Sequence, residues 1–188
     1  MSRNPDLDRQ ARDILVRNDR GGYTVPTHGL YPFQWNWDSA FVALGFAEFD
    51  RDRAWAEIET LVSAQWDDGM IPHIVFHQRD EGYFPGPDVW ATGRTPPTSG
   101  ITQPPVLATI VRELWEAEGA DPACERMRAL YRACLASHRW FHTFRDPLGN
   151  GLQPVRFLLR LHQRREQQRV EHRVVEAHAS LAFLELQE

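Results

Sequence analysis

Hydrophobic residues recur at helical spacing along most of this 188-residue chain. Such spacing places them on one face of a helix, where they can pack against a core. Asn4 is a favourable N-cap residue and Pro5 suits the first helical position, so a helix is expected to begin there. The spacing predicts helices over residues 5–17, 37–49, 52–66, 104–118 and 121–144. No sustained alternation of apolar and polar residues indicates a strand, so the predicted fold class is all-α.

The predicted helix over residues 37–49 is apolar almost all round, in contrast to its neighbours. A helix of this kind is usually covered on every side, so it is predicted to be an inner element of a layered helical fold. Trp37 and Phe41 are accordingly expected to face the core. The amphipathic helix over residues 52–66 follows after a very short connection, and the two form a predicted α-hairpin.

Residues 67–103 are rich in glycine and proline and leave no room for a full helix. Irregular segments of this length within a compact domain are usually functional or disordered. Four aromatic residues argue against disorder: Phe76, Tyr83, Phe84 and Trp90. An ordered surface loop system is therefore expected.

Composition and charge narrow the function classes. The formal net charge is −5, and the 21 basic residues are all arginine. This balance argues against a surface for nucleic acid or an anionic membrane. No apolar run approaches the roughly 20 residues of a membrane span, and no signal-peptide pattern is present, so a cytoplasmic location is expected. Cys124 and Cys134 lie about 15 Å apart on one predicted helix, beyond disulfide reach, and are expected to be buried thiols.

The last 37 residues differ in composition from the rest. All seven Trp, all four Tyr, every Gly and every Asp precede residue 152, and an Arg-, Gln- and His-rich sequence follows. Two parts are therefore predicted, residues 1–151 and a divergent tail over residues 152–188. Either the tail is an exposed terminal helix, or the original continuation of the chain has been lost or replaced.

Four stretches together resemble the glycoside hydrolases of family 63 type, in particular the mannosylglycerate and glucosylglycerate hydrolases. They are Tyr31-Pro-Phe-Gln-Trp-Asn-Trp-Asp-Ser-Ala-Phe41, Asp68-Gly-Met-Ile-Pro-His73, Tyr83-Phe-Pro-Gly-Pro-Asp-Val-Trp90 and Thr98-Ser-Gly-Ile-Thr-Gln-Pro-Pro105. The resemblance implies an (α/α)6 toroid with a sugar pocket at its open end. It also implies inverting hydrolysis of an α-glycosidic bond in a small glycosylated organic acid, without a cofactor. Twelve helices of ordinary length exceed this chain, so it is expected to hold only the first part of a toroid.

The resemblance also suggests which residues contact the sugar. A carboxylate can accept hydrogen bonds from two neighbouring sugar hydroxyls, which suits Asp38. The alternative is that Asp38 is simply an acid in the first turn of a helix, where the dipole favours one. Tyr31 and Trp35 offer ring faces with polar tips, although either residue alone would more often pack in a core.

Three loop residues complete the predicted substrate-binding set. His73 follows Ile-Pro, which holds the backbone extended and can direct the imidazole into a pocket. Tyr83 and Gln103 lie in stretches that match ligand-facing loops of the family, and loop stabilisation is the alternative for both. His73 and His77 have the spacing of a helical metal pair. Pro72 argues against a helix there, so no metal site is predicted.

The resemblance leaves the catalytic residues unassigned. Inverting hydrolysis needs a general acid and a general base. By resemblance, the acid would be an aspartate shortly after the turn that ends at Leu152, and the base a glutamate much further along. The sequence from Gln153 contains no aspartate. Three hypotheses follow: a glycosylglycerate hydrolase, a sugar-binding module without turnover, or an incompletely folded gene fragment.

Overall fold

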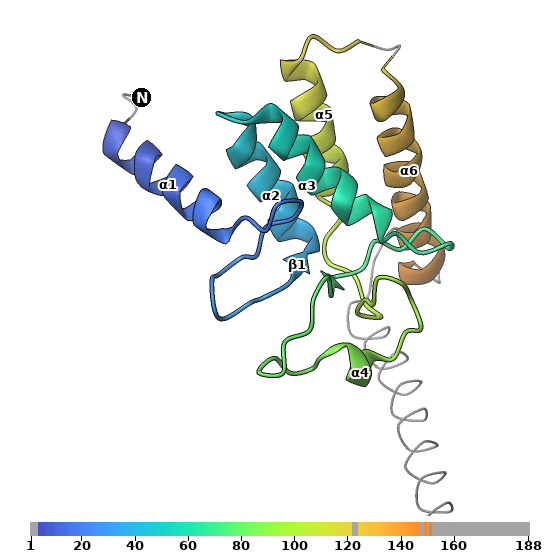
Figure 1. The fold of residues 1–188 in the computed structure, drawn as a ribbon. Coiled ribbons are helices and arrows are strands. Elements are labelled where there is room, and N and C mark those ends of the chain that lie inside the picture. The colour runs from blue at the N-terminus through green and yellow to red at the C-terminus, as the bar shows by residue number, and fades with distance from the viewer. Residues whose placement is uncertain (1–3, 122–123, 147–148, 150, 152–188) are drawn as a thin grey trace, which may run out of the picture. The chain divides into compact units, whose positions relative to one another are not determined.

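A computed structural model describes residues 4–121, 124–146, 149 and 151. The chain divides into two units, residues 1–144 and 145–188, and the second lies almost wholly outside the described residues. The predicted tail over residues 152–188 therefore lies outside them, and the division of the chain at residue 151 stays a prediction. The elements in chain order are α1 (Pro5–Asn18), β1 (Gln34–Trp35), α2 (Asn36–Ala47), α3 (Arg51–Ser63), β2 (Ile74–Val75), α4 (Pro87–Trp90), α5 (Leu107–Ala117) and α6 (Glu125–Arg145) (Figure 1).

The first helix begins as predicted. The Asn4 side chain accepts a hydrogen bond of 3.1 Å from the backbone N–H of Asp6, and Pro5 occupies the first helical position. Leu15 packs against the main core where α1 meets α2. The contact is close, because a Cβ atom added at Gly45 would lie 2.7 Å from Leu15 Cδ1.

Helix α2 lies at the centre of the first unit and contacts α1, α3 and α5. Ala40, Ala43 and Phe46 form its buried side. The expectation that Trp37 and Phe41 face the core is wrong: their side chains are 42% and 54% exposed. The apolar sequence predicts cover on every side, but within the described part of the chain the neighbouring helices cover only part of the α2 surface.

The main core joins α2, α3, α5 and α6. Helix α5 contributes the four residues predicted to face inward, namely Leu107, Ile110, Val111 and Leu114. It begins three residues later than predicted, because Pro104 precedes another proline and is disfavoured in helical conformation. Both cysteines are free, as expected, but only Cys134 is buried, and burial raises the pKa of its thiol to about 11. Cys124 is half-buried and directly precedes α6.

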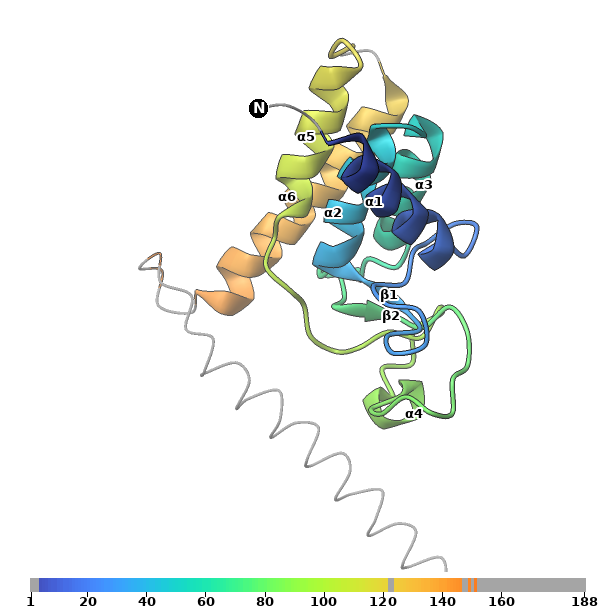
Figure 2. The same cartoon turned by 90° about the vertical axis from the view of Figure 1, so that its left-hand side faces the viewer.

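The region over residues 67–103 is an ordered loop system, as predicted, with two short regular elements. One is α4, and the other is β2, which pairs antiparallel with β1 in the register Gln34↔Val75 and Trp35↔Ile74. The fold is thus mostly helical rather than purely helical, because strands of two residues are too short to produce an alternating pattern. Figures 1 and 2 agree that β1 and α4 lie at one end of the array formed by α2, α3 and α5.

Gly69 fixes the start of this loop system. Its φ of +100° is in the left-handed region, and an added Cβ would lie 2.6 Å from the carbonyl oxygen of Ala136. Only glycine meets both demands. Among the described residues, no helix is both long and apolar enough to cross a membrane.

Candidate functional site

The two-stranded ladder brings together two of the predicted site residues, Trp35 and His73. Trp35 pairs with Ile74, and the backbone N–H of Asn36 donates to the carbonyl of His73 over 3.1 Å. The Trp35 and His73 rings consequently meet edge to face, with their centroids 4.5 Å apart. Residues nearly forty positions apart in sequence thus share one surface.

The His73 imidazole is held uncharged by its surroundings. Burial against the two indole rings of Trp35 and Trp90 lowers the pKa of His73 from 6.5 to about 4. Ser99 Oγ lies 3.2 Å from His73 Nδ1 and accepts the backbone N–H of Ile74 over 3.0 Å. At neutral pH the ring is therefore uncharged, and its Nδ1 is hydrogen-bonded to Ser99 Oγ.

Further aromatic side chains extend this cluster. Tyr31 meets Trp35 edge to face at a centroid distance of 5.3 Å, and Tyr83 meets Phe33 in the same way at 5.1 Å. Burial, and secondarily the neighbouring Tyr31, raise the pKa of the Tyr83 hydroxyl. The structure therefore brings four of the six predicted residues into one aromatic group, namely Tyr31, Trp35, His73 and Tyr83.

The remaining two predicted residues, Asp38 and Gln103, form a polar pair at the N-terminus of α2. Gln103 Oε1 accepts the backbone N–H of Trp37 over 3.1 Å. Burial raises the pKa of the Asp38 carboxyl, and hydrogen bonds from its own backbone and from the side chains of Gln103 and Trp37 partly oppose this rise. Asp38 is thus a half-buried acceptor that is held by its own backbone and by two neighbouring side chains.

The polar pair and the aromatic group are linked through the backbone. The N–H of His73 donates to the carbonyl of Ile101 over 2.7 Å, so the segment that leads to Gln103 runs beside the one that carries His73. Asn36 extends the link, since its side-chain amide donates to the Ile71 carbonyl over 3.2 Å. The site is therefore assembled from four segments: β1 with the start of α2, the β2 region, the loop around α4 that carries Tyr83, and the loop before α5.

Two buried indole nitrogens in this cluster have no hydrogen-bond partner among the described residues. They are Trp35 Nε1 and Trp90 Nε1. Buried N–H groups are nearly always paired in folded proteins, so these two are unsatisfied donors within the described part of the chain. Trp90 is not among the predicted site residues, because its position in the sequence indicates only an aromatic loop residue.

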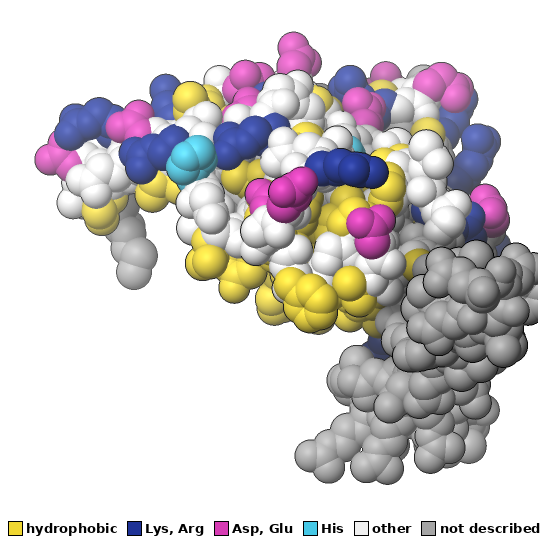
Figure 3. Space-filling model, turned by 60° about the horizontal axis from the view of Figure 1, so that its bottom comes forward, with side chains coloured by type: hydrophobic (Ala, Val, Ile, Leu, Met, Phe, Trp, Pro, Cys, Tyr) yellow, Lys and Arg dark blue, Asp and Glu magenta, His cyan; other side chains and the backbone are white. Residues whose placement is uncertain are grey.

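Figure 3 views the end of the molecule that carries the loops, where hydrophobic side chains gather in a patch. Exposed apolar residues of these loops include Leu30, Tyr31, Phe84 and Val89, and Phe84 is the most exposed at 81%. The aromatic group thus lies at a face with apolar surroundings, which suits the ring faces of a sugar.

His77 does not pair with His73. Its Nε2 lies 2.8 Å from Gln34 Oε1, and its ring stacks on Tyr23 at a centroid distance of 4.2 Å. Burial lowers the pKa of His77. The two histidines hydrogen-bond to different partners, so the four-residue spacing in sequence brings about no shared site.

Comparison with known proteins identifies the family. A sequence model of the "Mannosylglycerate hydrolase MGH1-like glycoside hydrolase domain" matches residues 31–156. This chain belongs to that family. The matched span includes all six predicted site residues, and it also includes Trp90.

Relatives from a plant and a bacterium are similar over the same part of the chain. Mannosylglycerate hydrolase MGH1 of Selaginella moellendorffii is 56% identical over 143 residues, which are 75% of this chain and 29% of that protein. Mannosylglycerate hydrolase of Thermus thermophilus is 54% identical over 147 residues, 76% of this chain and 35% of that protein. This chain thus spans about a third of the length of the curated relatives it matches.

A solved structure agrees with both findings. The crystal structure of a GH63 mannosylglycerate hydrolase from Thermus thermophilus, in complex with Tris and D-glycerate, is 57% identical with a TM-score of 0.70. The match covers 75% of this chain and 34% of that one. It confirms the helical fold of the matched part, whereas the complete (α/α)6 toroid stays a prediction.

Proposed function

We propose that this chain is the sugar-recognition part of a glycoside hydrolase that acts on mannosylglycerate or glucosylglycerate. The observation that carries the proposal is the cluster of Trp35, His73 and Asp38 at the loop end of a chain in the mannosylglycerate hydrolase family. A solved relative described as a complex with D-glycerate indicates the kind of substrate.

Each group in the cluster has a chemical role in this proposal. The Asp38 carboxyl accepts hydrogen bonds from two sugar hydroxyls, and neutral His73 forms a further hydrogen bond without adding a charge. The free indole N–H groups of Trp35 and Trp90 donate to sugar oxygens. The exposed ring of Tyr31 covers an apolar face of the sugar.

The hydrolytic step requires two carboxyl groups that the cluster does not supply. Inverting enzymes hold their acid and base about 6.5–9.5 Å apart on opposite sides of the glycosidic bond. Asp38 is already engaged by Gln103 and Trp37. We assign it to binding and assign no residue of this chain to acid or base catalysis.

Calorimetry with mannosylglycerate and glucosylglycerate tests the proposal. The wild-type chain is expected to bind at least one of them, and Asp38→Asn to bind it about tenfold or more weakly, because charged hydrogen bonds are lost. Asp52→Asn is the matched control, since Asp52 is an exposed acid in the first turn of α3. No heat from the wild type at millimolar ligand would contradict the proposal.

A sugar-binding module without turnover is the second candidate function. It is favoured by the observation that the described cluster offers the carboxyl of Asp38 but no acid and base pair, which inverting hydrolysis needs. Release of free mannose or glucose by the purified chain would exclude it, whereas binding without release would support it. A cooperative thermal unfolding transition, followed by near-ultraviolet signals of the tryptophans, would exclude the third hypothesis of an incompletely folded fragment.

A further inference from the structure

A buried carboxylate lies behind the candidate site. Glu57 of α3 is fully buried, and four donors surround it, two on each oxygen. Oε1 accepts from Gln34 Nε2 over 3.0 Å and from Ser39 Oγ over 2.5 Å. Oε2 accepts from Thr24 Oγ1 over 2.7 Å and from Arg53 Nη2 over 2.8 Å.

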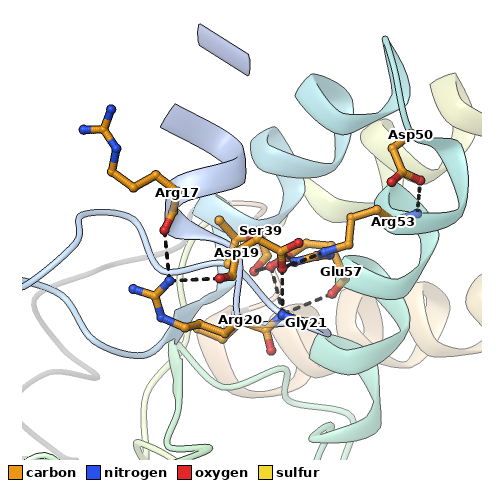
Figure 4. Close-up of polar contacts among 10 residues, drawn as sticks. Arg17, Asp19, Arg20, Gly21, Ser39, Asp50, Arg53 and Glu57 are labelled. Carbon is orange, nitrogen blue, oxygen red and sulfur yellow. Dashed lines mark hydrogen bonds and ion pairs between the residues drawn. The ribbon is translucent and has the colours of Figure 1, made fainter. Parts of the chain in front are cut away.

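The charge of Glu57 is balanced within the same group. Figure 4 shows Asp19, Ser39 and Glu57 converging around the Arg53 side chain. Arg53 pairs with Glu57 and also with Asp19, at 2.8 Å in each case. Burial acts to raise the pKa of Asp19, but the hydrogen bond and charge of Arg53, together with backbone hydrogen bonds from Gly21 and Arg20, outweigh it and lower that pKa overall. Two acidic side chains are thus paired with one guanidinium.

Two of the four donors adjoin site residues in sequence. Gln34 directly precedes Trp35 in β1, and Ser39 directly follows Asp38 in the first turn of α2. Gln34 is the more constrained of the two, since its amide nitrogen also donates to the Glu57 carbonyl over 3.0 Å. Its Oε1 is then the acceptor of the His77 Nε2–H, so every polar atom of this buried side chain is engaged.

We propose that Glu57 is a positioning residue. Through Gln34 it holds Trp35 against His73, and through Ser39 it holds Asp38 in the first turn of α2. Four donors need an acceptor with four lone pairs directed at them, which a carboxylate provides and an amide does not. The effect on sugar affinity rests on the proposed function, whereas the placement of Trp35 and Asp38 is a property of the free protein.

Two substitutions separate positioning from general stabilisation. Gln34→Met keeps the side-chain length and removes the link between Glu57 and β1. Thr24→Val also removes a donor to the Glu57 carboxylate, but Thr24 is not adjacent in sequence to any site residue. The measurement is the titration of the His73 ring by NMR in the ligand-free chain, with unfolding followed in parallel.

In Gln34→Met the His73 pKa is expected to rise from about 4 towards its ordinary value of 6.5, because Trp35 no longer shields the ring from water. In Thr24→Val it is expected to stay at the wild-type value, although both variants lose stability. An unchanged His73 pKa in Gln34→Met, or an equal rise in both variants, would overturn the proposal.

Ser39→Ala decides the question if Gln34→Met does not fold. It removes the donor that links α2 to Glu57. The Asp38 pKa is then expected to fall towards 3.8, because the first turn of α2 becomes less ordered and water reaches the carboxyl. Ser63→Ala, an exposed serine at the end of α3, is the matched control. An Asp38 pKa that does not change in Ser39→Ala would count against the proposal.

A second measurement separates this inference from the proposed function. Binding of mannosylglycerate to Gln34→Met is expected to be about tenfold or more weaker than to the wild type. If the His73 pKa rises in that variant while the wild type binds no glycosylglycerate, the positioning role stands and the proposed function fails. If the wild type binds and the His73 pKa does not change in Gln34→Met, the proposed function stands and the positioning role fails.

Discussion

Replacing His73 by glutamine should remove a pH-dependent part of the stability of this protein. In the folded chain the imidazole stays neutral down to a pKa of about 4, because it is buried against Trp35 and Trp90. In the unfolded chain it takes up a proton near its ordinary value of 6.5. Between these two values the unfolded state binds more protons than the folded state, so the free energy of unfolding falls as the pH falls.

The size of this effect follows from the two pKa values. Each pKa unit corresponds to about 1.4 kcal/mol, so the interval from 6.5 to about 4 sets an upper limit of about 3.5 kcal/mol. The ring is not completely enclosed, and partial hydration in the folded state reduces the figure, so a loss of about 1–3 kcal/mol is expected. The contribution is fully present above pH 6.5 and is lost as the pH falls towards 4.

Urea unfolding at a series of pH values from 4 to 8 measures the effect. The wild type and His73→Gln share all other titrating groups, including His77, so the difference between their free energies of unfolding isolates His73. This difference is expected to be constant above about pH 7. Below that pH the wild type should lose free energy of unfolding relative to the variant. Parallel pH profiles of the two proteins would refute the reasoning.

Two further predictions concern the elements that support the site. Gly69→Ala is expected to lower the free energy of unfolding by about 1–3 kcal/mol, because the added Cβ meets the Ala136 carbonyl oxygen at a positive φ. Gly82→Ala is its control, since Gly82 is exposed and its φ is not in the left-handed region; equal losses in the two variants would contradict the explanation. Asn4→Ala is expected to cost about 1 kcal/mol by removing the cap bond to Asp6, whereas Asn4→Ser should retain most of that stability. Thermal unfolding checks both predictions, and no difference between the two Asn4 variants would rule out capping as the cause.

The helices were predictable because their determinants are local. The cap at Asn4, the apolar spacing in α5 and the short turn before α3 act over a few residues each, and the structure confirms them. The exposure of Trp37 and Phe41 could not be predicted, because a helix that is apolar on all sides does not indicate which side its neighbours cover. The same limit applies to β1 and β2, whose pairing depends on how α2, α3 and the segment after them return the chain to β1.

The candidate site likewise contains residues that the sequence indicated and one that only the structure shows. Motifs resembling a known family indicated Tyr31, Trp35, Asp38, His73, Tyr83 and Gln103, and the structure brings them together in two linked groups. Their roles as sugar contacts stay predictions. Neither the residues nor the resemblance pointed to Trp90 as a site residue, because its relevance lies in a buried indole N–H that only the assembled loops reveal.

Glu57 illustrates why the support of a site is harder to read from sequence than the site itself. In sequence it is one acid among several on an amphipathic helix, four residues after Arg53, and this spacing is typical of an exposed ion pair. Its burial results from Thr24, Gln34 and Ser39, three residues whose polar side chains are directed inward from other segments. An isolated buried carboxylate would be strongly unfavourable, so these donors and Glu57 are stable inside the fold only as a set. The same set holds Gln34, which precedes Trp35, and Ser39, which follows Asp38. The geometry of the candidate site therefore depends on Glu57, which lies outside all four family-like motifs.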